Sequence, residues 1–222
     1  MLPYLAWQAS SVKKRFPLPP AQSERLIPGS GPDQYLILGE STAAGVGASD
    51  QSQTLAGKFY QALGPEIQVY NFGKNGIRTG ECLPYFRKDL EQLAGEKEGI
   101  LLFLGANDSF KLTHPKRFKQ QLQELIGYLE HRFQPSWIYL ADIPPVHLFP
   151  AFPKTLQSYL KIQRRYLTSE MQNLASANPI LYYQTLHLDL EPDFFSQDLI
   201  HPSDKGYQAI MDFTLEVIPK KA

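Results

Sequence analysis

The sequence lacks three features that mark specialised classes of protein: paired cysteines, an excess of one charge, and a long apolar run. Cys82 is the single cysteine, which excludes an internal disulfide. Lys plus Arg and Asp plus Glu both total 22, so no net field would draw the chain to nucleic acid. We therefore expect no nucleic-acid partner and a small, weakly charged molecule instead.

The N-terminus begins with a short apolar stretch, Met1–Ala9, which is followed by Lys13, Lys14 and Arg15. The stretch is too short to span a bilayer, and a secretory signal would place its basic residues first. It is either the stub of an anchor with its basic cluster on the cytoplasmic side, or a plain tail. The sequence predicts a cytoplasmic or membrane-associated protein, with weak membrane association through the N-terminus left open.

Residues 1–32 are expected to form an irregular lead-in, because 16–32 alone holds five prolines and two glycines. The remainder, 33–222, is apolar enough for one domain, in which strand-like runs alternate with segments of helical periodicity. The five runs are Gln34–Leu38, Ile67–Phe72, Ile100–Leu104, Trp137–Ala141 and a weaker Ile180–Tyr183. This alternation predicts an α/β fold, a three-layer α/β/α sandwich with a parallel, flavodoxin-like sheet of about five strands. Function in such sheets collects at the carboxyl ends of the strands.

A serine block, Gly39–Gly47, follows the first predicted strand. Ser41 would stand at the strand end in a turn of small residues, with its hydroxyl exposed for nucleophilic attack. A helix N-cap is the plain alternative for such a serine. A phosphate-binding loop is disfavoured, because the P-loop lysine is absent and Asp50 stands where a third glycine would be needed.

The second and third strands end in Asn71–Gly76 and Gly105–Asp108. A glycine lets a backbone N–H approach a ligand closely, and an asparagine side chain offers two donors from a fixed strand end. Such donors suit an oxyanion. Ordinary turn chemistry is the alternative for each loop, since Asn and Gly are common in turns everywhere.

Asp198 precedes His201 by three residues, just before a last helix expected to begin near Ser203. A carboxylate at this spacing can accept a hydrogen bond from Nδ1, which leaves Nε2 free to take a proton from a serine. The alternative is that Asp198 and His201 form half of a metal site. We expect no metal, because the other histidines show no ligand spacing and paired cysteines are absent. These histidines are His114, His131, His147 and His187.

Together the four blocks resemble the SGNH hydrolases, also called the GDSL esterase and lipase superfamily. The signature serine, glycine, asparagine and histidine correspond to Ser41, Gly76, Asn107 and His201, and Asp198 corresponds to the acid. The resemblance covers roughly residues 34 to 215 and extends loosely to a bacterial branch with a Pro-rich lead-in. Gly76 is preferred to the nearby Gly73 because the family's glycine stands five residues beyond the asparagine that closes the second strand.

One position departs from this pattern, because the usual Gly-Asp-Ser is Gly-Glu-Ser here, with Glu40 before the nucleophile. The sequence assigns no chemical role to Glu40 and leaves its support of the loop open. The α/β-hydrolases are excluded, since their elbow would need glycine at Ala43 and their acid and histidine lie far apart.

The resemblance implies a serine hydrolase that cleaves small-molecule acyl esters without a cofactor. His201 would deprotonate Ser41, and an oxyanion hole of the Ser41 and Gly76 N–H groups and the Asn107 side chain would hold the intermediate. Acyl transfer, or hydrolysis of carbohydrate O-acetyl esters, would use the same triad. The alternative outside the enzymes is a non-catalytic binding protein with the same fold.

The segment Ile143–Pro153 follows the fourth strand and holds four prolines among large apolar residues. Proline excludes a regular helix, so this apolar run must lie in a loop at the carboxyl end of the sheet. Phe149 and Phe152 are therefore candidate substrate-binding residues, with core packing as the alternative.

Overall fold

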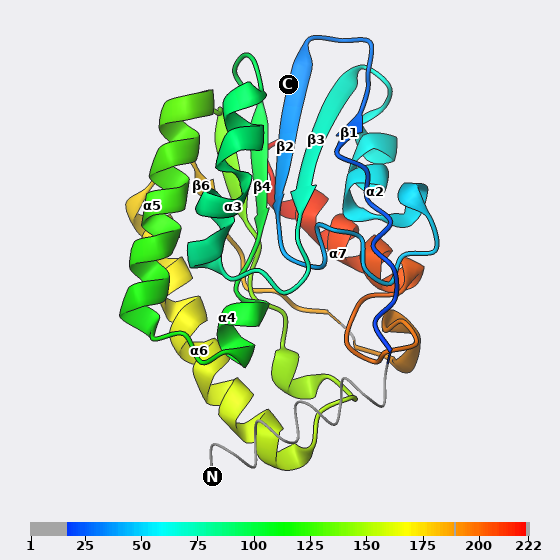
Figure 1. Ribbon diagram of the computed structural model, residues 1–222, viewed down its shortest axis with the longest axis vertical. Helices are drawn as coiled ribbons and strands as arrows, with labels where there is room; N and C mark the ends of the chain where they lie inside the picture. Colours follow the sequence, from blue (N-terminus) through cyan, green and yellow to red (C-terminus); the bar gives the residue numbers. More distant parts are fainter. Residues whose placement is uncertain (1–16, 189, 221–222) are drawn as a thin grey trace.

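The computed structural model of the protein describes residues 17–188 and 190–220 (Figure 1). The stretch Met1–Ala9 and the basic residues after it, on which the anchor interpretation depends, lie outside the described residues. Within the described part of the chain, no helix is long and apolar enough to cross a membrane.

A central sheet of six strands has the order β1-β3-β2-β4-β5-β6. All neighbouring strands are parallel except β1, which pairs antiparallel with β3 at one edge. The strands are β1 (Leu26–Ile27), β2 (Asp33–Gly39), β3 (Ile67–Gly73), β4 (Gly99–Phe103), β5 (Trp137–Leu140) and β6 (Leu181–Tyr182). The predicted α/β/α architecture is confirmed, and its five parallel strands have the flavodoxin-like order.

Helices cover both faces of this sheet, as parallel crossovers require. One face carries α3, α5 and α6, and the other carries α2 and α7 (Figure 1). The elements are α2 (Leu55–Leu63), α3 (Thr79–Gln92), α4 (Ala106–Phe110), α5 (Pro115–Phe133), α6 (Lys154–Ala177) and α7 (Asp204–Val217), with short 3-10 turns η1 (Gln51–Gln53), η2 (Val146–Leu148) and η3 (Pro192–Phe194).

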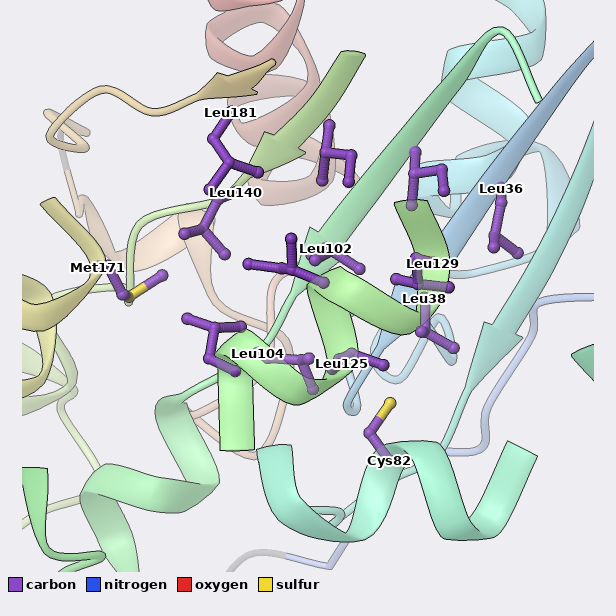
Figure 2. Close-up of a cluster of buried hydrophobic side chains, with 14 of the residues drawn as sticks. Leu36, Leu38, Cys82, Leu102, Leu104, Leu125, Leu129, Leu140, Met171 and Leu181 are labelled. Carbon is purple, nitrogen blue, oxygen red and sulfur yellow. The ribbon is translucent and has the colours of Figure 1, made fainter. Parts of the chain in front are cut away.

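The alternation of side chains along β2 divides the core into two layers. Leu36 and Leu38 point to the first face, where Figure 2 shows them with Cys82 of α3 and Met171 of α6. Tyr35 and its neighbours on the opposite face pack against α2 and α7. Because both faces are buried, the strand register is fixed by the core.

The lead-in is more ordered than the sequence suggested, because part of it packs on the serine block. Its strand β1 adds the antiparallel edge, and the backbone N–H of Ser23 donates to the carbonyl of Ala44 at 3.2 Å. Gly45 has φ 74°, and a side chain there would meet Ser23 at 2.7 Å. The lead-in therefore supports the turn that carries Ser41.

Candidate active site

Ser41 is the second residue after the end of β2, which lies between β3 and β4 in the sheet. The chain leaves β2 for β3 on one side and then returns to β4 on the other, so Ser41 lies at the topological switch point, where α/β sheets bind ligands. A tight turn holds the serine: Ala44 N–H donates to the Glu40 carbonyl at 3.0 Å and Val46 N–H to the Ser41 carbonyl at 3.1 Å. Only 9% of Ser41 is exposed.

The end of β3 packs tightly on this turn. The Asn71 side chain donates to the Ala43 carbonyl at 2.9 Å, and a Cβ at Gly73 would lie 2.1 Å from the Ala44 nitrogen. Gly73 is thus required for close backbone packing. Gly76, the preferred oxyanion-hole residue, has φ 79° and no atom within 4 Å of a Cβ built on it.

Asp108 and Lys111 bring the loop of Gly76 and the start of α4 together. The buried Asp108 carboxylate accepts from the backbone N–H and the hydroxyl of Thr79 at 2.9 and 2.8 Å. The Lys111 ammonium donates to the Gly76 carbonyl at 2.9 Å. Because Asn107 stands beside Asp108, these contacts fix the two predicted oxyanion-hole loops relative to one another.

Glu40 contacts the start of α4 directly, which the sequence did not indicate. Its buried carboxylate accepts from the backbone N–H groups of Ala106 and Asn107 at 2.8 and 2.9 Å, and also from the Asn107 side-chain amide. Burial raises the pKa of Glu40 to about 7, against the opposing effect of these donors. The residue that departs from the family pattern therefore holds the predicted oxyanion-hole asparagine.

Asp198 and His201 are joined by a hydrogen bond, with 2.5 Å between Asp198 Oδ2 and His201 Nδ1. The other carboxylate oxygen accepts from the backbone N–H groups of Ile200 and His201 at 3.0 and 2.9 Å and from the Ser196 hydroxyl at 2.9 Å. Burial alone would raise the pKa of Asp198, but the contacts with His201 and the backbone outweigh it and hold the pKa below its usual range. The acid is therefore held ionised against the imidazole.

The Asp198–His201 loop packs against the serine turn. A Cβ at Gly47 would lie 2.4 Å from the Pro202 carbonyl oxygen, and the Tyr207 hydroxyl donates to the Val46 carbonyl at 2.8 Å. Helix α7 begins after this loop with Ser203 as its N-cap, as expected, since the Ser203 hydroxyl accepts from Gly206 N–H. The structure thus places Ser41, Asp198 and His201 in adjoining turns at one edge of the sheet.

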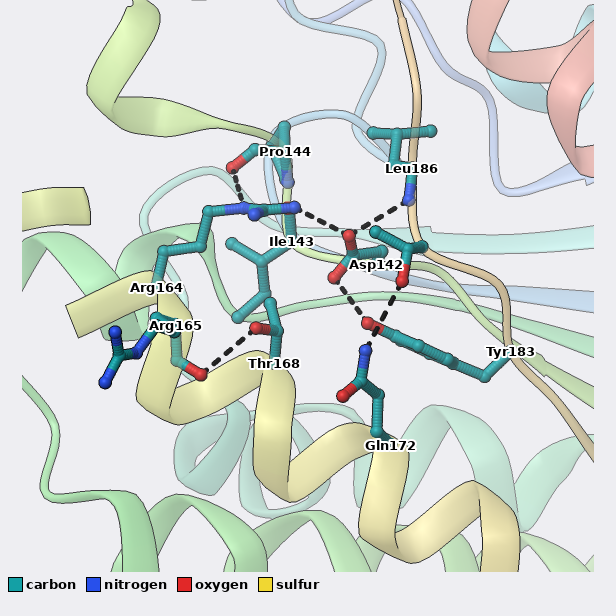
Figure 3. Close-up of polar contacts among 10 residues, drawn as sticks. Asp142, Ile143, Pro144, Arg164, Arg165, Thr168, Gln172, Tyr183 and Leu186 are labelled. Carbon is teal, nitrogen blue, oxygen red and sulfur yellow. Dashed lines mark hydrogen bonds and ion pairs between the residues drawn. The ribbon is translucent and has the colours of Figure 1, made fainter. Parts of the chain in front are cut away.

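The Pro-rich loop after β5 is held by a buried ion pair (Figure 3). Asp142, with a fully buried side chain, accepts from the Arg164 guanidinium at 2.6 Å and from the Tyr183 hydroxyl at 2.8 Å. Arg164 also donates to the carbonyl of Ile143 at 2.7 Å. The loop is therefore fixed to α6 and to the segment after β6.

Phe149 and Phe152 lie in an apolar cluster between this loop and the segment before Asp198. Phe149 is 6% exposed, and its ring meets Phe195 edge-on with centroids 5.3 Å apart. Phe152 is half-buried and meets Phe110 at 5.3 Å. The contacts favour core packing for Phe149 and leave Phe152 at the border of the cluster.

Replacing Phe149 with alanine should therefore destabilise the protein and leave the acyl preference unchanged. A buried Phe→Ala change costs about 3–5 kcal/mol, which lowers the melting temperature by roughly 10 °C in a chain of this size. Phe152→Ala, the matched control, should lower it much less. An altered preference across esters of increasing acyl length, at a nearly unchanged melting temperature, would instead make Phe149 a pocket wall.

Two of the cavities on the described residues differ in size and position. The larger, of about 410 Å³, is an open groove between α3 and α5, away from Asp198 and His201. The smaller, of about 40 Å³, adjoins the serine turn and is lined by Glu40 and Thr42, on either side of Ser41, together with Pro144 of the Pro-rich loop. Neither cavity is lined by Ser41, Asn107 or His201 themselves. No group of three or more His, Cys, Asp or Glu side chains among the described residues could hold a metal ion.

An α/β/α sandwich that gathers these residues at the carboxyl edge of its sheet has the layout of an SGNH-type hydrolase. The model of the GDSL-like Lipase/Acylhydrolase family matches residues 37–209, so the chain belongs to this family. The protein is accordingly a carboxylic ester hydrolase.

Three proteins similar to the chain are named as a lipase, an esterase and a member of an acetylesterase family. The spore germination lipase LipC of Bacillus licheniformis is 21% identical, over 81% of this chain and 93% of that protein. The psychrotrophic esterase EstA from Pseudoalteromonas sp., in a structure inhibited by monoethylphosphonate, has a TM-score of 0.62 at 22% identity and covers 84% of this chain and 96% of its own. A carbohydrate acetylesterase family member from Sinorhizobium meliloti has a TM-score of 0.57 at 18% identity, over 82% and 94%. At these identities the structural likeness establishes the shared fold.

Proposed function

We propose that the protein is a serine esterase of one domain, 33–222, in which Ser41, His201 and Asp198 form a catalytic triad. The observation that carries the proposal is the 2.5 Å contact between Asp198 Oδ2 and His201 Nδ1 in a loop packed against the serine turn. This contact keeps the proton on Nδ1, so that Nε2 can take the proton of the Ser41 hydroxyl.

In the proposed reaction, Ser41 Oγ attacks the ester carbonyl carbon while His201 Nε2 accepts its proton. The oxyanion that forms is stabilised by the N–H groups of Ser41 and Gly76 and by the Asn107 side chain. His201 then gives the proton to the leaving alcohol, and the acyl group remains on Ser41. Water, deprotonated by the same histidine, attacks the acyl-enzyme and releases the acid.

A second candidate function is the hydrolysis or transfer of a short acyl group, such as the acetyl ester of a carbohydrate. It would use the same triad and acyl-enzyme, with a sugar hydroxyl as the leaving group in hydrolysis or as the acceptor in transfer. The acetylesterase from Sinorhizobium meliloti shows that the fold occurs in a carbohydrate acetylesterase family.

A panel of p-nitrophenyl esters from acetyl to palmitoyl, with an acetylated sugar and an acyl-coenzyme A, would separate these candidates. Peak kcat/KM with acetyl esters would support the short-acyl candidate. A peak with palmitoyl esters would contradict it. Activity on none of these substrates would contradict the esterase proposal itself.

Asn107→Ala should lower kcat by about 10²–10³ with little change in KM, because the amide meets substrate oxygen only once charge has moved onto it. Steady-state kinetics on the best ester of the panel would measure this. A rise in KM at constant kcat would show that Asn107 positions the substrate in its ground state instead.

A further inference from the structure

Glu40 is a buried carboxylate with only 4% of its surface exposed, and its hydrogen-bond partners all lie at the start of α4. Burying an ionisable group is costly unless its lone pairs are satisfied. Here Oε1 accepts from the Ala106 N–H, and Oε2 accepts from both the backbone N–H and the side-chain amide of Asn107. The carboxylate therefore contacts the consecutive backbone N–H groups of Ala106 and Asn107 and also the Asn107 side chain.

The contact with the side-chain amide determines how Asn107 can act. An asparagine amide carries two N–H donors and one carbonyl acceptor. One N–H of the amide donates to Glu40. If the amide rotated by half a turn, its carbonyl oxygen would face the Glu40 carboxylate, and the two oxygens would repel each other. The second N–H is thus kept in one direction, which is what a donor aimed at a transient oxyanion requires.

We infer that Glu40 is a positioning residue that holds the Asn107 amide in the orientation needed to donate to the oxyanion. The inference rests on the proposed role of Asn107 in the oxyanion hole. Glu40 would act through Asn107 and would not touch the substrate. A purely structural carboxylate, which only completes the hydrogen bonds of the first turn of α4, is the competing role.

The charge of Glu40 should make this positioning sensitive to pH. Burial raises its pKa to about 7, and the neighbouring Asp108 carboxylate acts in the same direction. The other ionisable groups near it are the buried Cys82 thiol of α3, which interacts with it, and Asp142, which lines the same small cavity and is paired with Arg164. As pH falls through about 7, Glu40 gains a proton and the Asn107 amide loses its ionised acceptor.

A double-mutant cycle tests the inference, with Glu40→Gln, Asn107→Ala and the double variant assayed on the best ester of the panel. Glu40→Gln should lower kcat about 10- to 100-fold with KM within about twofold, less than the loss from removing the donor itself. In the Asn107→Ala background, the same change should cost less than about twofold, because coupled residues are not additive. Equal losses in both backgrounds would overturn the inference.

Two further variants keep the test decisive. Glu40→Asp retains the charge with a shorter reach, so it should keep more activity than Glu40→Gln; equal losses would contradict a role for the charge. If Glu40→Gln fails to fold, Glu40→Asp takes its place in the double-mutant cycle. Glu81→Gln, the matched control, removes a carboxylate that caps α3 through Arg78 and should leave kcat unchanged.

The pH profile separates positioning from simple folding support. Log kcat/KM of the wild type should fall as the pH drops through about 7, where Glu40 gains its proton, and this part of the fall should be absent from Glu40→Gln. Identical profiles would contradict the inference. An inactive wild type that no phosphonate labels would contradict the esterase proposal instead, so the two failures are distinguishable.

Discussion

Ser41→Ala should lower kcat by about a factor of a million while the fold remains intact, which is the largest effect we expect from any single substitution. Without the hydroxyl there is no acyl-enzyme, and the remaining rate comes from the oxyanion hole and substrate binding alone. The variant should fold, because the turn is held by backbone hydrogen bonds from Ala44 and Val46 that do not use the Ser41 side chain.

The matched control is Ser49→Ala, a serine of the same segment whose hydroxyl contacts Asp50 at 3.4 Å. It should retain full activity. Circular dichroism melting would show that both variants fold like the wild type. A folded Ser41→Ala variant that kept a tenth of the activity would exclude Ser41 as the nucleophile.

Asp198→Asn should have the second largest effect, lowering kcat by up to about 10⁴. The asparagine oxygen could still accept from the backbone N–H groups of Ile200 and His201, which contact Oδ1 in the wild type. Its NH₂ group would then face His201 Nδ1 and favour a proton on Nε2. The histidine would keep its place but lose its ability to act as a base.

Two other acids close to Asp198 in the sequence serve as comparisons. Asp193 pairs with Lys205 at 2.5 Å on the surface, so Asp193→Asn should cost little activity. Asp189 lies outside the described residues, and its replacement should also cost little. The activity of these variants would be measured under the same conditions as that of Asp198→Asn. An equal loss of activity at either position would contradict the assignment of Asp198 as the acid of the triad.

Much of the fold is predictable from the sequence because parallel strands between helices are buried on both faces and appear as continuous apolar runs. The five parallel strands, from β2 to β6, can be predicted from such runs. Strand β1 is missed because two residues, Leu26 and Ile27, within a proline-rich segment give no periodic signal. Its pairing depends on β3, which is distant in the chain.

The candidate site is predictable where its residues are close in sequence and not where the contact is long-range. Asp198 and His201 are three residues apart, so their hydrogen bond follows from one turn of chain. Glu40 and Asn107 are 67 positions apart, and Asp142 and Arg164 are joined across a loop and a helix. No local pattern indicates such pairs, because the packing of the sheet brings them together.

Labelling with a fluorophosphonate probe is the most direct test of the proposed nucleophile. Such a probe reacts with a serine only when a neighbouring base activates it. Digestion and mass spectrometry of the labelled wild type should place a single adduct on Ser41, and Ser41→Ala should give none. An unlabelled wild type, or an adduct on any other serine, would contradict the account.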